Sequence, residues 1–335
     1  MVKRKNRLSV EEYVEGILAG NRVVLSRAIT LVESSLASDQ HLAEEVVNRI
    51  MPHTGNSLRI GITGVPGVGK STFIESFGKL VVDQGNKLAV LAIDPSSQKT
   101  KGSILGDKTR MEELSHNSNA FIRPTPAGAA LGGVSAKTRE SMLLCEAAGF
   151  NVIFIETVGV GQSEIMVKGM VDFFLLLMLS GAGDELQGIK KGIIEIADAI
   201  AITKADGDNI EASKKAKREY NNALHLFPLN DNGWRPQVKI CSAVSKDGLA
   251  DIWTMVQEYK TAMQANGFFE ENRSNQRVSW FDEHVRYLLE SRFFQQKEVK
   301  AGLIDMLPKI KNGEMSSISV ARYLVDYFLK DIPND

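Results

Sequence analysis

The sequence contains the stretch Gly64-Val65-Pro66-Gly67-Val68-Gly69-Lys70-Ser71, which fits the phosphate-loop pattern G-x-x-x-x-G-K-[ST]. The pattern requires a strand before it and a helix after it, and the apolar run at 58–63 and the helical periodicity at 71–80 supply both. Glycines let backbone N–H groups face phosphate oxygens, a lysine adds positive charge, and a serine hydroxyl can ligate Mg²⁺. We therefore predict a nucleotide site made of these eight residues and Thr72; a ligand-free glycine turn is the alternative.

Charge and hydropathy narrow the class of protein. The chain has 335 residues and a formal net charge of −1, which gives no sign of the basic field typical of nucleic-acid or membrane-surface binders. Its longest strongly apolar stretch, 173–179, is far shorter than the roughly 20 residues that cross a bilayer. The basic start at 3–7 is not followed by an apolar signal core. We expect a cytoplasmic protein that binds neither nucleic acid nor membrane.

Short apolar runs alternate with helical stretches from residue 58 onward, the pattern of a parallel sheet covered on both faces. Strands are expected at 58–63, 88–93, 120–123, 152–155, 173–179, 199–203 and 238–241, and helices at 71–84, 137–148, 209–224 and 249–264. The predicted fold class is α/β: a doubly wound, mostly parallel P-loop NTPase domain at 58–266 with N-terminal and C-terminal helical extensions.

The two extensions have helical patterns of their own. Residues 1–57 begin with a capping box from Ser9 to Glu12 and predict an N-terminal helical extension. In 267–335, apolar residues recur at three- and four-residue steps without intervening strands, which predicts a C-terminal helical module. Periodicity alone leaves open whether that apolar stripe packs on the parent domain or forms a dimer surface.

Carboxylates are expected at the carboxyl edge of the sheet, where ligands of such folds gather. Asp94 closes one predicted strand and can contact metal or orient water. Glu156 follows another, and the glycines after it can sense a γ-phosphate; an ordinary strand-to-helix turn is the alternative. Asp107 lies in the glycine-spaced segment 102–110, which can close on the nucleotide, although a helix cap is an equally simple role.

A guanine-reading motif is indicated by Thr203-Lys204-Ala205-Asp206, which resembles the Asn-Lys-x-Asp signature of many GTPases. The Asp206 carboxylate can accept hydrogen bonds from the N1–H and amino groups of guanine, an arrangement that adenine does not offer. Thr203 stands in place of the usual Asn, which weakens support from that side chain. Ser242 and Ala243 fit a second base-contacting loop, although this dipeptide is common by chance. We favour guanine over adenine.

Several segments occur in one order: the phosphate loop, Asp-Pro-Ser-Ser (94–97), Gly-Ser-Ile-Leu-Gly-Asp-Lys-Thr-Arg-Met (102–111), Glu-Thr-Val-Gly-Val-Gly-Gln-Ser-Glu (156–164), Gly-Ala-Gly-Asp-Glu-Leu-Gln-Gly-Ile-Lys-Lys-Gly (181–192) and Thr-Lys-Ala-Asp (203–206). Together they closely resemble the MeaB/ArgK family of methylmalonyl-CoA mutase-associated GTPases over roughly residues 58–253. The glycine-rich, charged segment 180–192 is more typical of a switch than of a solvated connector, its simpler alternative.

The resemblance implies a GTPase, with Mg²⁺ and bound GTP or GDP, that chaperones an adenosylcobalamin-dependent acyl-CoA mutase. It also implies gating of cofactor loading, protection of the mutase, a homodimer through the C-terminal helices, and a third mobile loop at 180–192 that carries the nucleotide state to the partner. By match to the family pattern, Lys70, Asp94 and Glu156 are candidate catalytic residues. Ser71, Asp94, Asp107 and Glu156 surround the metal, and Lys204 and Asp206 hold the base.

Two other function classes stay open at this point. An ATP-dependent kinase or ATPase of an amino-acid transport system is suggested by older naming in the family, and the Thr-Lys-Ala-Asp segment disfavours it. A nickel or zinc insertion chaperone would need a Cys or His cluster, which the sequence lacks. No arginine or glutamine finger is evident, and we hypothesise that the mutase brings Lys190 or Lys191 toward the phosphates.

Overall fold

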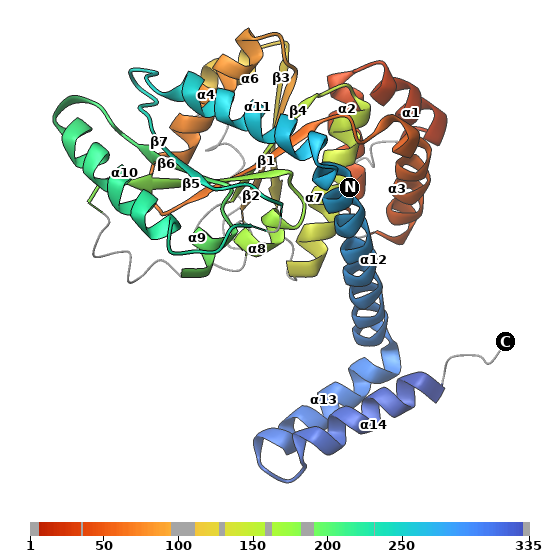
Figure 1. The fold of residues 1–335 in the computed structure, drawn as a ribbon. Coiled ribbons are helices and arrows are strands. Elements are labelled where there is room, and N and C mark those ends of the chain that lie inside the picture. Colours follow the sequence, from red (N-terminus) through yellow and green to blue (C-terminus); the bar gives the residue numbers. More distant parts are fainter. Residues whose placement is uncertain are drawn as a thin grey trace. The chain divides into compact units, whose positions relative to one another are not determined.

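The computed structural model describes residues 7–34, 36–94, 111–126, 131–157, 163–181, 191–230 and 232–330 (Figure 1). The chain divides into two compact units, Met1–Gln276 and Arg277–Asp335. The first unit contains both the sheet and the N-terminal helices. The expected division at residues 57 and 266 stays a prediction.

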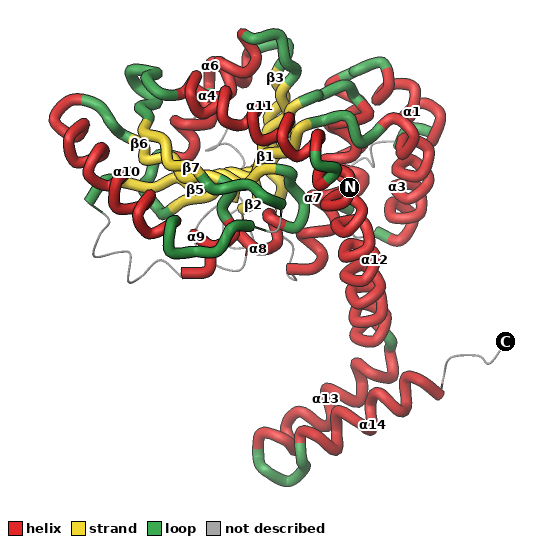
Figure 2. Tube along the Cα trace, viewed as in Figure 1, coloured by secondary structure: helices red, strands yellow, loops and turns green. Residues whose placement is uncertain are grey.

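A seven-stranded sheet forms the centre of the first unit, in the order β3-β2-β4-β1-β5-β6-β7. Its strands are β1 (Leu58–Gly64), β2 (Leu88–Asp94), β3 (Ala120–Pro126), β4 (Val152–Thr157), β5 (Phe173–Leu179), β6 (Ala199–Thr203) and β7 (Gln237–Ile240). Every pair of neighbouring strands is parallel. The central strand β1 is buried along its whole length, because helices cover both faces (Figure 2). The predicted α/β fold class is confirmed.

The covering helices are α4 (Lys70–Asp83), α6 (Glu112–His116), α7 (Leu131–Ala147), α8 (Ser163–Lys168), α9 (Lys191–Ile196), α10 (Ile210–Leu224) and α11 (Leu249–Ala265), with a 3₁₀ turn η3 (Gly207–Asn209). The sequence analysis missed α6, α8 and α9 because helices of five or six residues are too short to show helical periodicity. It also placed the start of α7 at residue 137. Gly132 and Gly133 in the first turn disfavour a helix on propensity alone.

The N-terminal helices are α1 (Val10–Leu18), α2 (Arg22–Val32) and α3 (Ala37–Ile50), followed by the 3₁₀ turn η1 (Met51–His53). The capping box is confirmed, since the Ser9 hydroxyl accepts from the Glu12 amide and the Glu12 carboxylate accepts from the Ser9 amide at 2.7 Å. The three helices pack on one another and on α7. Tyr13, Ile17 and Ile29 are completely buried there. Both cysteines, Cys145 and Cys241, are free thiols and are buried.

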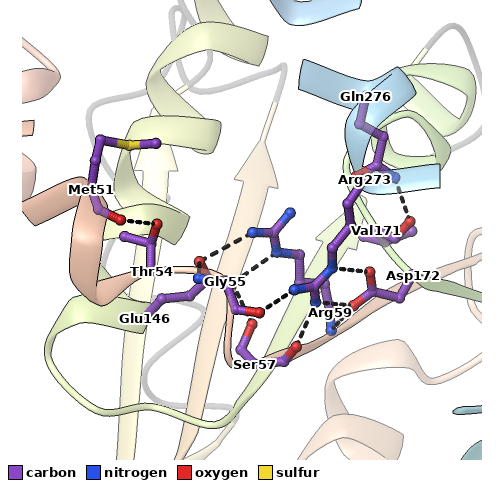
Figure 3. A network of polar contacts seen from close by, with 10 residues as sticks. All are labelled: Met51, Thr54, Gly55, Ser57, Arg59, Glu146, Val171, Asp172, Arg273 and Gln276. Atoms are coloured by element: carbon purple, nitrogen blue, oxygen red, sulfur yellow. Dashed lines mark hydrogen bonds and ion pairs between the residues drawn. The ribbon is translucent and has the colours of Figure 1, made fainter. Parts of the chain in front are cut away.

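Two buried ion pairs lie at the amino edge of the sheet (Figure 3). Arg59 on β1 pairs with Glu146 on α7 at 2.8 Å, and Arg273 on α12 (Phe268–Gln295) pairs with Asp172 at 2.7 Å. Asp172 also accepts from the Arg59 amide at 2.8 Å, so the two pairs form one network. These contacts attach the first turns of α12, up to Gln276, to the sheet.

The second unit contains the rest of α12, α13 (Lys297–Lys311) and α14 (Ser317–Lys330). Phe293 and Phe328 make an edge-to-face contact with ring centroids 5.4 Å apart. Among the described residues of this unit, the buried apolar side chains are Val299, Val320 and Leu324. Among the described helices of the chain, none combines the length and apolar character needed to cross a membrane.

Candidate nucleotide site

The phosphate loop has the predicted geometry: β1 ends at Gly64 and α4 begins at Lys70, so residues 65–69 connect a central strand to a helix N-terminus. A Cβ atom on Gly64 would lie 2.5 Å from the carbonyl oxygen of Leu177 on the neighbouring strand β5, which only glycine avoids. Gly69 has a φ of 90°, in the left-handed region that favours glycine. The loop amides and the N-terminus of α4 together form an anion-binding cradle.

Lys70 folds back across this cradle. Its ammonium donates to the carbonyl oxygens of Gly64 at 2.8 Å and Val65 at 3.4 Å. Burial lowers the pKa of Lys70, while the carboxylates of Glu156 and Glu164 act in the opposite direction. Burial outweighs the two carboxylates, so the net effect of these surroundings is to disfavour the charged form of the lysine.

Glu156 and Asp94 come from neighbouring strands at the same edge. Glu156 on β4 lies beside Ile62 of β1 and is 4% exposed. The next residue, Thr157, is in register with Ile93 of β2, so the backbone of Asp94 follows directly at that edge. Glu156 thus lies beside β1, the strand that leads into the phosphate loop, and Asp94 lies one strand further away, on β2. The side chain of Asp94 and all of Asp107 lie outside the described residues.

The metal-ligand prediction of Ser71, Asp94, Asp107 and Glu156 has two members with a described side chain. Ser71 is the second residue of α4 and is partly buried, and Glu156 is buried at the strand end. Within the described part of the chain, no group of three or more His, Cys, Asp or Glu side chains is arranged to hold a metal ion. Most of the segment 180–192 is also outside the described residues, although Lys191 begins α9.

The guanine motif lies directly against the phosphate loop. The Lys204 ammonium donates to the Gly67 carbonyl oxygen at 2.9 Å, and the Thr203 hydroxyl donates to that of Val68 at 2.9 Å. Lys204 has a φ of 57°, an uncommon conformation for a residue other than glycine. Its carbonyl oxygen accepts from the Asn209 side chain at 2.6 Å. Two motifs far apart in sequence are therefore in direct contact.

The second base-contacting loop joins the same site. The Ser242 hydroxyl, completely buried, donates to the Asp206 carboxylate. It accepts from the amides of Val244 at 3.2 Å and Ser245 at 3.1 Å, so its orientation is fixed. The carbonyl oxygen of Ala243 accepts from a hydroxyl on α4 at 2.7 Å. The Asp206 carboxylate, which we expect to read guanine, thus accepts a hydrogen bond from the loop that follows β7.

Three residues of this site were missed from the sequence. Ser76 supplies the α4 hydroxyl that holds Ala243, Asn209 supports Lys204, and the fully buried Glu164 on α8 acts electrostatically on Lys70. Ser76 and Asn209 belong to no motif that could have indicated them. Glu164 is the last residue of the segment 156–164, and its position in that segment was the only feature of the sequence that could have indicated it.

Comparisons with known proteins agree with this geometry. Residues 25–298 match the family described as methylmalonyl-CoA mutase-associated GTPase MeaB. A putative GTPase of Caulobacter vibrioides is 50% identical over 321 residues, covering 96% of this chain and 98% of that protein. GTPase ArgK of Escherichia coli is 44% identical over 322 residues, covering 96% and 97%.

A solved structure gives the same result in three dimensions. The crystal structure of a protein named LAO/AO transport system kinase superposes with a TM-score of 0.75 at 38% identity, covering 98% of this chain and 100% of that one. The resemblance seen in the sequence is confirmed over nearly the whole chain. With the phosphate loop and guanine motif joined in one site and these relatives matched along their length, the chain belongs to the MeaB family of methylmalonyl-CoA mutase-associated GTPases.

Proposed function

We propose that this protein hydrolyses GTP as the chaperone of an adenosylcobalamin-dependent acyl-CoA mutase of the methylmalonyl-CoA mutase type, gating cofactor loading and protecting the mutase. The contact of Lys204 with Gly67 at 2.9 Å carries most weight, because it makes the base motif and the phosphate loop one site. The family description supports association with the mutase.

Hydrolysis of GTP to GDP and phosphate requires a water in line with the γ-phosphate and a cradle for the developing negative charge. Lys70 and the loop amides supply that cradle. Glu156, buried at the strand end, and Asp94 would orient the attacking water, or the water shell of a bound Mg²⁺. Because no arginine or glutamine finger is evident in the sequence, intrinsic turnover is expected to be slow.

Mg²⁺ fits the residues present, since P-loop enzymes hold it through one hydroxyl, the phosphates and water rather than through an all-protein cage. Ser71, partly buried in the first turn of α4, is the hydroxyl in question. Asp94, Asp107 and Glu156 would complete its surroundings. When bound, the ion neutralises charge on the β and γ phosphate oxygens.

The second unit supports a homodimer. Its helices leave large apolar side chains exposed, with Phe281 67%, Ile304 77% and Ile318 73% accessible. Exposed apolar surface of this kind typically marks a protein interface. The apolar stripe predicted along α12 includes Phe281, and a second copy of the chain offers the same stripe in return.

The test is GTP turnover with and without a methylmalonyl-CoA-type mutase, alongside titration with GDP, GTP, ADP and ATP in magnesium buffer. The proposal expects guanine-selective binding and turnover that the mutase accelerates. Adenine preference, or turnover indifferent to the mutase, would instead favour an ATP-dependent kinase, the activity by which the solved relative is named.

A further inference from the structure

Two adjoining cavities lie beside β7, the last strand in the sheet order. The first cavity has a volume of about 250 Å³, and its lining includes the apolar residues Ile194, Leu224, Phe227, Pro228 and Leu229. Glu195 is the one acidic residue among those that line it. The second, of about 390 Å³, shares Leu224, Arg235 and Pro236 with the first. Neither includes a residue of the nucleotide site.

The second cavity runs along the edge of β7. Gln237, Val238 and Lys239 all line it, and consecutive strand residues point to opposite faces of a sheet. Because this cavity is lined by three consecutive strand residues, we infer that it follows the backbone along the edge of the strand. Among the described strands, β7 pairs only with β6, so no described strand occupies its other edge, and residues of α10 line the same cavity.

The charged residues that line the second cavity are all basic. Lys217, Arg235 and Lys239 line it together with His225, and its lining residues include no acid. Arg235 donates to Nδ1 of His225 at 2.7 Å, so these two lining residues contact each other. The neighbouring apolar cavity exceeds the ~150 Å³ that holds a benzene ring, so it can take one leucine- or phenylalanine-sized side chain.

We propose that this surface, the open edge of β7 with its two cavities, docks an extended acidic segment of a partner protein. The segment adds a strand to β7, its carboxylates face Lys217, Arg235 and Lys239, and one apolar side chain enters the first cavity. The surface lies at the C-terminal end of α10 and the start of β7 (Figure 1). Asp206 and Ser242 follow the carboxyl ends of β6 and β7, and neither residue lines either cavity.

The test uses fluorescein-labelled nine-residue peptides that alternate leucine with glutamate, or leucine with lysine, against the full chain. The groove variant is Lys217→Glu with Lys239→Glu. Its matched control is Lys214→Glu with Lys215→Glu, exposed lysines of the same helix that line neither cavity. The acidic peptide should bind, and its affinity should fall at least about tenfold in the groove variant but not in the control. Leu229→Ser, at a side chain 57% exposed, should also weaken binding.

Thermal unfolding and GTP turnover of each variant check that the fold and nucleotide site are intact. Equal binding of both peptides, no binding of either, or equal loss in groove and control variants would overturn the proposal. So would binding of a single-stranded oligonucleotide in place of the acidic peptide, because the groove would then serve a nucleic acid.

Discussion

Thr203 donates a hydrogen bond of 2.9 Å to the carbonyl oxygen of Val68, across 135 positions of sequence. Both residues are buried, with 3% and 1% of their surface exposed. The hydroxyl fixes a carbonyl of the phosphate loop at the point where the guanine motif begins. A threonine here lacks the amide of the usual asparagine, yet it braces the loop directly.

Thr203→Val keeps the shape of this side chain and removes the donor. The buried Val68 carbonyl then loses a partner, at a cost of about 1–3 kcal/mol in the braced loop. If the bond holds the loop in its binding conformation, this cost appears in nucleotide affinity, and GDP binding measured by calorimetry should fall about tenfold, since 1.4 kcal/mol is a factor of ten. Thr203→Ser retains the hydroxyl and should bind GDP nearly as the parent protein does. Equal affinities of the two variants would show that the bond does not support binding.

Lys70→Ala should abolish GTP turnover without unfolding the protein. The lysine contacts loop carbonyls, and its removal leaves the apolar core untouched. We expect turnover to fall by about 10²–10³ or more, as for loss of a preorganised donor at a transition state. Lys79→Ala on the same helix, whose lysine pairs with Glu113 at the surface, is the control. Loss of turnover in both variants would mean that the helix, not the phosphate contact, was damaged.

The network at the amino edge of the sheet predicts a stability effect. Glu146→Gln leaves the buried Arg59 guanidinium without its charged partner, which should lower the free energy of unfolding by about 3–5 kcal/mol in urea titrations. Replacing both residues, as Arg59→Met with Glu146→Leu, should cost much less, because the charge of Arg59 is removed together with that of its partner Glu146. A double variant less stable than Glu146→Gln would contradict this account.

The same network predicts a dependence on pH. Burial alone would raise the pKa of Glu146, but Arg59, Ser57 and the Gly55 amide outweigh it and hold the pKa below its ordinary value of 4.5. The stabilisation is therefore complete above about pH 4.5 and is lost as pH falls through the lower value of the folded state. Urea titrations of the parent and of Glu146→Gln between pH 7 and pH 3 should converge at the acid end. If the stabilities of the two proteins instead differed by the same amount at every pH, the Arg59–Glu146 ion pair would not be the source of the pH dependence.

Phe281→Glu should dissociate the proposed homodimer. The residue is 67% exposed in the apolar stripe of α12, and a charge there opposes burial against a second copy. Sedimentation velocity should show a monomer for this variant and a dimer for the parent. Val23→Glu, at a side chain 69% exposed on α2, is the control and should remain dimeric. A parent protein that sediments as a monomer would overturn the dimer.

The sequence predicted the elements of the site better than their contacts. The phosphate loop and Thr-Lys-Ala-Asp were recognisable because each motif is contiguous and ends a strand of the sheet. The bonds between them were not, because they depend on the order β1-β5-β6, which brings Val68 beside Thr203. Ser76 was invisible for the same reason, since its partner Ala243 lies beyond β7. The roles assigned to Asp94, Asp107 and Glu156 stay predictions.

The most direct test of the central claim is the nucleotide preference of Asp206→Asn. In the parent protein the Asp206 carboxylate, held by Ser242, should accept from the N1–H and amino groups of guanine. An asparagine accepts from N1–H but donates with its amide, which matches the carbonyl that xanthine carries in place of the amine. Calorimetric titration should therefore show selectivity for GDP in the parent and for xanthosine diphosphate in the variant, with similar thermal stability. Unchanged GDP binding in Asp206→Asn would contradict the guanine site described here.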